Sequence, residues 1–319
     1  MGISANKRNK GDNLDLDWSE ASISRFLLKV SYIGTNYFGI AYQRNNEFPT
    51  VEGEIYKSLL QLRLIRDFES CDLVRCGRTD RGVHSAGNYI SVNLRTRNKD
   101  LKPYNYTEML NGVLPWDIRI LGFCQVRDNF SARFDCSYRI YKYFFPLSYY
   151  KQKNPKFPFV TPEGVDIMNK AAKQFIGTHD YRRFCKIDIK NRDHQTYTRT
   201  IHEFEIQISN LEESKYAIAT IKGSAFLWHQ VRLMIGILFE IGQSKMKPEV
   251  ISEMLKNYQD KNTGKHSFHM ASENGLILWD CVFEEYSIQN SCNSLTTFLE
   301  ESNNLEFQTC IYRFISSNT

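Results

Sequence analysis

The sequence lacks a long apolar segment. Its longest apolar stretch, residues 233–241, is interrupted by Glu240 and is much shorter than the roughly 20 residues that cross a bilayer. The basic residues near the N-terminus are followed by Asp12, Asp15 and Asp17 instead of an apolar segment, which is not the pattern of a signal peptide. We therefore expect no membrane partner.

The eight cysteines and seven histidines do not have the spacing of a metal site. No Cys-x-x-Cys pair occurs, and the two closest cysteines, Cys71 and Cys76, are five residues apart. We expect reduced, mostly packed thiols in an intracellular protein, and no metal site. The sequence also has no phosphate-binding loop and no dinucleotide glycine fingerprint, so we expect no nucleotide cofactor.

Net charge is only +5, but the basic residues gather in a few segments. Three arginines crowd residues 75–81, and further basic groups fall in residues 95–102, 151–156 and 182–192. Tyrosines and phenylalanines are interleaved with these charges, which favours a polyanion that carries flat bases. At this net charge, composition by itself fits an ordinary soluble surface better.

A similar order of elements occurs twice along the chain. Each half has the order strand, helix, two strands, helix, strand, which is the order of a split βαβ, ferredoxin-like unit. The expected segments of the first half are a strand at 26–32, a helix from Thr50, strands on both sides of residues 76–87, a short helix at 106–112 and a strand at 118–126. Those of the second are strands at 138–145, 203–208, 216–222 and 276–283, with helices at 161–177, at 226–241 and from Pro248.

We predict an α+β fold in which these two related halves form a central mixed, mainly antiparallel sheet with flanking helices and a cleft between them. The expected limits are a disordered tail at 1–21, an N-terminal half at 22–147, a C-terminal half at 148–288 and a peripheral appendage at 289–319.

Residues 76–87 (CGRTDRGVHSAG) are the most informative segment. They place Asp80 between Arg78 and Arg81, in a glycine-rich loop between two expected strands, where a rigid scaffold can hold a functional side chain. Residues 90–94, which follow the loop, alternate like a half-buried strand. The spacing alone is equally consistent with a turn aspartate beside solvated arginines.

The loop resembles the Gly-Arg-Thr-Asp-x-Gly-Val catalytic-loop pattern of the TruA-type pseudouridine synthases. Further blocks resemble the same family in the same order: residues 32–39 (YIGTNYFG), 110–118 (LNGVLPWDI), 130–134 with 138–143 (FSARF and YRIYKY), 223–232 (GSAFLWHQVR) and 275–278 (GLIL). Residues 184–188 (FCKID) and 226–232 look most like the eukaryotic branch that modifies tRNA positions 38 and 39. The sequence departs from that branch at His84 and Asn88, and from the family at residues 40–43, which replace a shorter Trp-Gln.

The resemblance implies two related α/β halves around a mixed sheet, with a catalytic cleft between them. It implies an isomerase that flips a uridine of the tRNA anticodon stem-loop out of its stack and converts it to pseudouridine, at positions 38/39, without a cofactor. It also implies tRNA as partner, a homodimer, and a place in the cytoplasm and/or nucleus. The alternatives are a sister synthase acting on other tRNA or RNA sites, and a non-catalytic RNA-binding protein on the same scaffold.

By the same resemblance, Asp80 is the catalytic carboxylate, and Arg78 favours its ionised form and helps to hold the flipped state. Tyr141 stacks on uracil or transfers a proton, although Tyr143 shares its strand face and spacing alone does not choose between them. Arg232 lies beside the aspartate, with a structural salt bridge to another carboxylate as the alternative.

We also assign a group of residues to substrate binding. His84 is expected to contact RNA or to be structural, and one of the two leucines forms an apolar pocket wall unless both simply pack in the core. The substrate-binding set is Arg75, Thr79, Arg81, His84, Lys186, His229, Leu276 and Leu278.

Overall fold

The computed structural model describes residues 17–43, 48–97, 103–147, 160–187, 196–211, 214–256 and 268–288. Residues 1–16 of the expected tail and the appendage at 289–319 lie outside these ranges. Both assignments, and the division between residues 147 and 148, stay predictions. No helix within the described ranges has the length and apolar character needed to cross a membrane.

Nine strands form one sheet, whose order is β4-β1-β3-β9-β5-β8-β7-β6, with β2 paired to β3. The elements of the first part are β1 (Ile23–Tyr32), η1 (Gly34–Asn36), α1 (Val51–Gln61), β2 (Val74–Arg75), β3 (His84–Arg95), α2 (Tyr106–Asn111) and β4 (Ile118–Gln125). Those of the second are β5 (Tyr138–Pro146), α3 (Pro162–Ala172), η2 (Lys173–Phe175), β6 (Gly177–Asp180), η3 (Arg182–Phe184), β7 (Thr198–Leu211), β8 (Ser214–Gly223), α4 (Gln230–Gly242), α5 (Val250–Lys256), η5 (Glu273–Gly275) and β9 (Leu276–Val282).

The strand order confirms the ferredoxin-like repeat. When the edge strand β6 is left out and the other strands are numbered along each half, β4-β1-β3-β2 and β9-β5-β8-β7 both have the spatial order fourth, first, third, second. The halves join where β3 runs parallel to β9, with His84 opposite Ile277 and Ser85 opposite Leu278. The other strand pairs are antiparallel, so the sheet is mixed and mainly antiparallel, as predicted. The edge strand β6 was not predicted.

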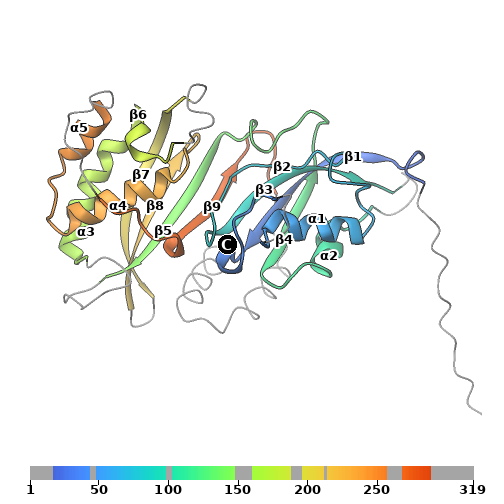
Figure 1. The fold of residues 1–319 in the computed structure, drawn as a ribbon, viewed down its shortest axis with the longest axis horizontal. Helices are drawn as coiled ribbons and strands as arrows, with labels where there is room; N and C mark the ends of the chain where they lie inside the picture. Colours follow the sequence, from blue (N-terminus) through green and yellow to red (C-terminus); the bar gives the residue numbers. More distant parts are fainter. Residues whose placement is uncertain are drawn as a thin grey trace, which may run out of the picture.

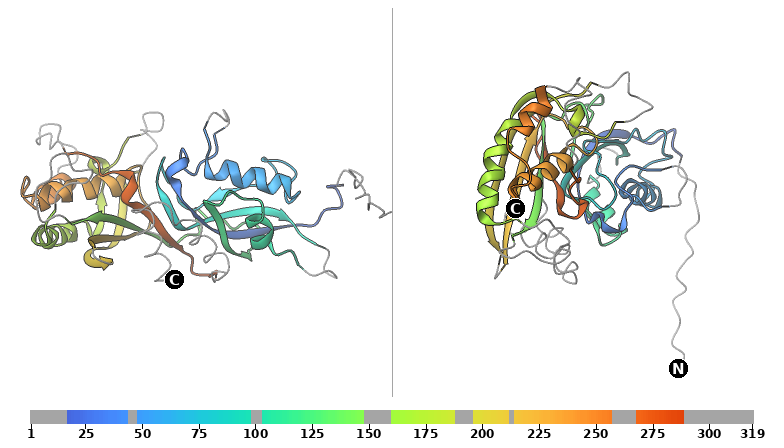
Figure 2. Two further views of the ribbon diagram at one scale, coloured as in Figure 1. Left: turned by 90° about the horizontal axis from the view of Figure 1, so that it is seen from below. Right: turned by 60° about the vertical axis from the view of Figure 1, so that its left-hand side comes forward.

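Each half carries its helices against its own part of the sheet. In Figure 1, α1 and α2 lie at one end of the molecule and α3, α4 and α5 at the other, with β3, β9 and β5 between them; Figure 2 shows the same separation from two other directions. One apolar core joins α1 and α2 to β1, β3 and β4. The larger core joins α3, α4 and α5 to β5, β7 and β8, and continues to Leu27 and Tyr89 of the first half.

Two helices begin at a threonine that caps the first turn with its side chain. The hydroxyls of Thr50 and Thr161 accept hydrogen bonds from the amides of Gly53 and Gly164, as expected for N-caps. The prediction for the apolar helix was wrong at its start, because α4 begins at Gln230 and not near residue 226. The preceding His229 has the left-handed φ of 63°, so the helix cannot extend backward through it.

Strand β3 is also different from the expected half-buried strand. It begins at His84, and ten of its twelve residues are buried, including the polar Ser85, Asn88 and Ser91. The alternation of apolar and polar residues at 90–94 predicts one exposed face, but β3 lies in the middle of the sheet and both of its faces are covered. Its buried side chains find partners: the Ser91 hydroxyl, for example, accepts from the Arg25 guanidinium and the Ala132 amide.

Candidate active site

The loop that carries Asp80 connects β2 to β3 and is held by buried polar side chains. The Asn88 amide accepts from the Gly77 backbone nitrogen at 3.0 Å and donates to the Gly77 carbonyl at 2.8 Å. The hydroxyls of Tyr32 and Thr79 lie 2.7 Å apart, and both side chains are buried. Side chains of β1 and β3 therefore fix the part of the loop that leads into Asp80. Thr79, assigned to substrate binding, is a positioning residue in this arrangement.

Two side chains from the turn before α4 hold the carboxylate of Asp80. Trp228 Nε1 donates to Oδ1 at 3.1 Å, and His229 Nε2 lies 3.2 Å from Oδ2. The Asp80 side chain remains 25% exposed. Partial burial raises the pKa of Asp80, but the hydrogen bond and attraction of His229, the hydrogen bond of Trp228 and the charge of Arg232 outweigh it and keep this pKa below its usual value. Asp80 is therefore an ionised, partly desolvated carboxylate with one accessible side.

The left-handed backbone at His229 explains how both donors reach Asp80. A helical His229 would continue α4, whereas its φ of 63° turns the chain and brings Trp228 and His229 to the loop of the other half. Sequence reasoning assigned His229 to the substrate and omitted Trp228. The family pattern leaves position 228 unspecified, so the only sequence signal was an indole donor next to His229.

Lys186 joins the same site through Trp228. Its backbone nitrogen donates to the Trp228 carbonyl at 2.9 Å, and its ammonium lies 4.5 Å from the centroid of the indole ring. The cation therefore contacts the face of the ring whose N–H group holds Asp80. The neighbouring Asp188, part of the segment that resembles the 38/39 branch, lies outside the described residues.

Arg232 is placed close to the loop but pairs with a different carboxylate. Its Nη2 lies 2.8 Å from Glu273 Oε2, and its Nε donates to the Ala271 carbonyl at 2.7 Å. Glu273 in turn packs against Gly82, where an added Cβ would lie 3.0 Å from Glu273 Cγ. The positive charge of Arg232 still lowers the pKa of Asp80 at longer range. The structure thus gives Arg232 the structural ion pair that we considered as the alternative, and links that pair to the loop that carries Asp80.

The two candidate tyrosines differ in what their hydroxyls do. Tyr143 is fully buried, and its hydroxyl donates to the Ser272 carbonyl at 2.9 Å. Tyr141 packs edge-to-face on Phe226, and its hydroxyl makes no hydrogen bond to the described residues. The structure therefore favours Tyr141 as the group that is available to a substrate, and Tyr143 as a structural residue. Burial raises the pKa of Tyr141 far above its usual value, so the phenol stays protonated.

The two leucines of β9 occupy different positions. Leu278 is fully buried, pairs with Tyr141 and lies under the loop, where a Cβ on Gly77 would meet its Cδ2 at 2.6 Å. Leu276 pairs with Tyr143 and is 5% exposed. Of the two, Leu278 is next to the candidate catalytic groups, where it supports the loop.

The remaining sequence-predicted residues divide into exposed and buried groups. Arg78 is exposed and makes no ion pair or hydrogen bond with the described residues. The exposed Arg81 guanidinium lies 4.2 Å from the centroid of the Phe38 ring. Arg75 instead pairs with the buried Glu52 at 3.1 Å. His84 is buried, and its Nδ1 accepts from the Gly34 amide at 3.3 Å, which is the structural one of its two expected roles.

Comparison with known proteins places these features in a family. A family model described as tRNA pseudouridine synthase matches residues 171–284. A relative from Methanosphaera stadtmanae, "tRNA pseudouridine synthase A", is 34% identical over 282 residues, which cover 87% of this chain and 92% of the relative. The chain belongs to the tRNA pseudouridine synthase family.

Eukaryotic members of the family are similarly close. The "tRNA pseudouridine(38/39) synthase" of Bos taurus is 38% identical over 292 residues, and that of Saccharomyces cerevisiae 35% over 286. They cover 84% and 86% of this chain but 57% and 60% of the relatives, so the chain spans a little over half of their length. These relatives bear the name of the branch that residues 184–188 and 226–232 resemble, which confirms that prediction.

Proposed function

We propose that this protein is an isomerase that converts uridine to pseudouridine in tRNA, at positions 38/39 of the anticodon stem-loop. The observation that carries the proposal is the Asp80 carboxylate, held by Trp228 and His229 at 3.1 Å and 3.2 Å and still 25% exposed. A reacting carboxylate must be ionised and reachable, and this environment provides both conditions. The names of the eukaryotic relatives support the choice of positions.

The surroundings of Asp80 suit a flipped base. A uridine taken out of its stack needs an aromatic or apolar surface and a proton-transfer group at its edge. Tyr141 supplies a protonated phenol whose hydroxyl no described residue occupies, and its ring packs on Phe226. We therefore assign Tyr141 to the base and Asp80 to the sugar and its glycosidic bond, with no cofactor needed for an isomerisation.

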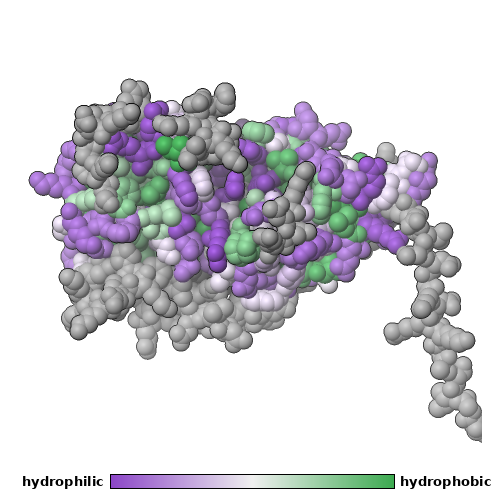
Figure 3. Space-filling model, viewed as in Figure 1, coloured by the Kyte–Doolittle hydropathy of each residue, from purple (hydrophilic) through white to green (hydrophobic). Residues whose placement is uncertain are grey.

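The surface next to the loop suits an RNA strand. Phe48 is 47% exposed and stacks on Phe38, with ring centroids 4.1 Å apart. The Arg81 guanidinium lies over the ring of Phe38. Aromatic faces beside arginines bind bases and phosphates together. Figure 3 shows one face of the molecule as mostly hydrophilic with separate hydrophobic patches. We assign Arg78, which makes no hydrogen bond or ion pair with the described residues, to a phosphate of the flipped nucleotide.

The direct test uses unmodified tRNA transcripts with uridine at position 38 or 39. Pseudouridine is measured by mass spectrometry of nuclease digests, and RNA binding by filter retention. We expect turnover by the wild-type protein, none by Asp80→Asn, and similar RNA affinity for both. Turnover retained by Asp80→Asn would overturn the role of the carboxylate, and binding without turnover by the wild-type protein would favour the non-catalytic alternative.

The choice of positions has its own test. Pseudouridines are mapped in tRNA from cells that lack this protein. We expect loss at positions 38 and 39, restored by the wild-type gene but not by the Asp80→Asn form. Loss at other tRNA sites or in another RNA, with 38 and 39 intact, would favour the sister-synthase alternative.

We also propose that the protein acts as a homodimer in the cytoplasm and/or nucleus. A second subunit would extend the surface available to an L-shaped tRNA. Light scattering during gel filtration, with and without tRNA, tests the dimer, and a monomer under both conditions would refute it. Fluorescence microscopy of the tagged full-length protein tests its location.

A further inference from the structure

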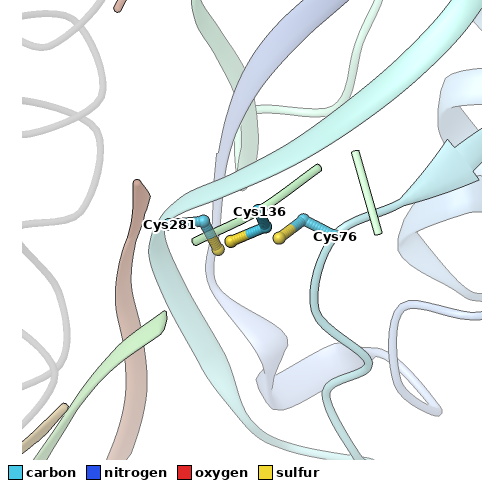
Figure 4. Close-up of side chains that lie close together, drawn as sticks. All are labelled: Cys76, Cys136 and Cys281. Atoms are coloured by element: carbon cyan, nitrogen blue, oxygen red, sulfur yellow. The ribbon is translucent and has the colours of Figure 1, made fainter. Parts of the chain in front are cut away.

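Three cysteines that are far apart in the sequence meet at the start of the loop that carries Asp80. Cys76 opens the loop that carries Asp80, Cys136 lies just before β5, and Cys281 lies on β9. Their sulfur atoms all lie within 4.8 Å of one another, and all three residues are buried. Figure 4 shows the three side chains turned toward one another. The expectation that the cysteines are scattered packing residues does not account for this convergence.

The spacing of the sulfur atoms is close to that of ligands on one ion. All three cysteines are free thiols and not disulfides. Thiolates bound to Zn²⁺ at about 2.3 Å in tetrahedral geometry are about 3.8 Å apart, so sulfur atoms that lie within 4.8 Å of one another need to approach by about 1 Å at most. Thiolate ligands select soft or borderline d¹⁰ ions such as Zn²⁺ and Cu⁺ over Mg²⁺ or Ca²⁺.

Arg139 provides an independent reason for negative charge at this place. It is buried at 9% exposure and faces Cys281 across the β5–β9 ladder. Its guanidinium donates to carbonyls only, those of Arg133, Ser224, Cys76 and Cys136, and it pairs with no carboxylate among the described residues. A buried cation needs an opposite charge nearby, and the sulfurs are in position to supply it.

Charge balance then selects a divalent ion. Three thiolates and one divalent cation carry a net charge of −1, which the guanidinium of Arg139 neutralises. With a monovalent ion the buried group would keep a net negative charge, which is unfavourable away from water.

A fourth ligand position is within reach. Cys136 Sγ lies 3.3 Å from the Tyr138 carbonyl oxygen and 3.6 Å from that of Val282. A sulfur and an oxygen on the same tetrahedral zinc are about 3.5 Å apart, so either carbonyl has a suitable spacing from Cys136.

We propose that Cys76, Cys136 and Cys281 bind a Zn²⁺ ion as thiolates, with a backbone carbonyl completing the coordination. The ion ties the start of the loop that carries Asp80 to β9 and to the segment before β5, and so joins the two halves of the sheet. The role is structural, and the proposal is independent of the function proposed above.

Metal content of the full-length protein is the first test. The wild-type protein, Cys136→Ser and the matched control Cys124→Ser are purified under reducing conditions with zinc in the medium and analysed by mass spectrometry of the elements. Cys124 is a half-buried cysteine on β4 outside the group. We expect stoichiometric zinc in the wild-type protein and in Cys124→Ser, and loss of zinc in Cys136→Ser.

A second measurement does not depend on the folding of a variant. The metal-free wild-type protein is titrated with Co²⁺ without oxygen, and absorption is recorded. We expect thiolate-to-cobalt charge-transfer bands that saturate at one equivalent of Co²⁺ per chain, which is about the capacity of a three-cysteine site. Added zinc should abolish these bands. Folded wild-type protein with neither zinc nor these bands would overturn the proposal, and Cu⁺ in place of zinc would overturn the choice of a divalent ion.

Discussion

The indole nitrogen of Trp228 donates a hydrogen bond to the Asp80 carboxylate across 148 residues of sequence. This contact joins the turn before α4, in the second half, to the loop before β3, in the first. His229 holds the other carboxylate oxygen, and Lys186 contacts the face of the indole. The candidate catalytic carboxylate is thus positioned by the half that does not carry it, so the two halves must be assembled before Asp80 has its environment.

Replacing Trp228 by Phe removes the donor and keeps an aromatic ring. A hydrogen bond to a charged group contributes about 1.5–3 kcal/mol, so we expect roughly a tenfold or greater loss in kcat/KM for tRNA. The donor lowers the pKa of Asp80, so its loss raises that pKa and moves the acidic limb of the pH–rate profile to higher pH. The control is Trp116→Phe, at a residue that is 42% exposed and outside the site. An unshifted acidic limb in Trp228→Phe would show that the indole does not tune Asp80.

Removing the hydroxyl from Tyr141 and, separately, from Tyr143 tests which of the two serves the substrate. Tyr143→Phe leaves the half-buried Ser272 carbonyl without its partner, so we expect a loss of about 1–2 kcal/mol in the free energy of unfolding and little change in turnover. Tyr141→Phe removes no hydrogen bond to the described residues, so stability should hold while turnover falls. Urea unfolding and single-turnover kinetics measure the two effects, and the opposite result would exchange the assignments.

The pair of Arg232 and Glu273 is suited to a double-mutant cycle. Arg232→Met, Glu273→Gln and the double variant should show a coupling energy of about 1 kcal/mol in unfolding, because Arg232 is buried but Glu273 is 39% exposed. Because Glu273 packs on Gly82, both single variants should also lower turnover. The pair of the exposed Lys57 and the half-buried Glu54, linked at 2.8 Å within one helix turn, is the control and should couple less. A full rate in Arg232→Met would leave this arginine with a structural role only.

Stability should fall in mild acid because of His84. Burial lowers the pKa of His84 from 6.5 to about 4, so between these values the unfolded chain binds a proton that the folded protein does not. The contribution of His84 is present above pH 6.5 and is lost as pH falls toward 4, by about 3 kcal/mol at most. The contribution of Asp80, whose pKa is lowered from 3.8, is present above pH 3.8 and is lost only as pH falls below that value.

The comparison is with His84→Asn, which keeps an acceptor for the Gly34 amide but has no titrating group. Free energies of unfolding are measured in urea from pH 7.5 to 4.5. We expect the wild-type protein to lose more stability over this range than the variant. Parallel curves of stability against pH would show that the pKa of His84 is the same in the folded and the unfolded protein, and would contradict the prediction.

The sequence by itself determined the family, the α+β class and the identity of the central loop. That information lies in short sequence motifs that follow one another in a fixed order. Each motif acts over a few neighbouring residues: examples are the alternation of strand residues, the helix caps Thr50 and Thr161, and the glycines of residues 76–87. The repeated order of elements was also sufficient to predict two ferredoxin-like units, since each unit is encoded by consecutive segments.

Tertiary structure decided which residues meet. Only the left-handed turn at His229 brings Trp228 to Asp80, and only packing of η5 on the loop pairs Arg232 with Glu273. The choice between Tyr141 and Tyr143 depended on the Ser272 carbonyl, which comes from a distant segment. The convergence of Cys76, Cys136 and Cys281 depends on the joint between the halves. Such contacts are set by how the sheet closes over its core, and the spacing of residues along the chain does not record that geometry.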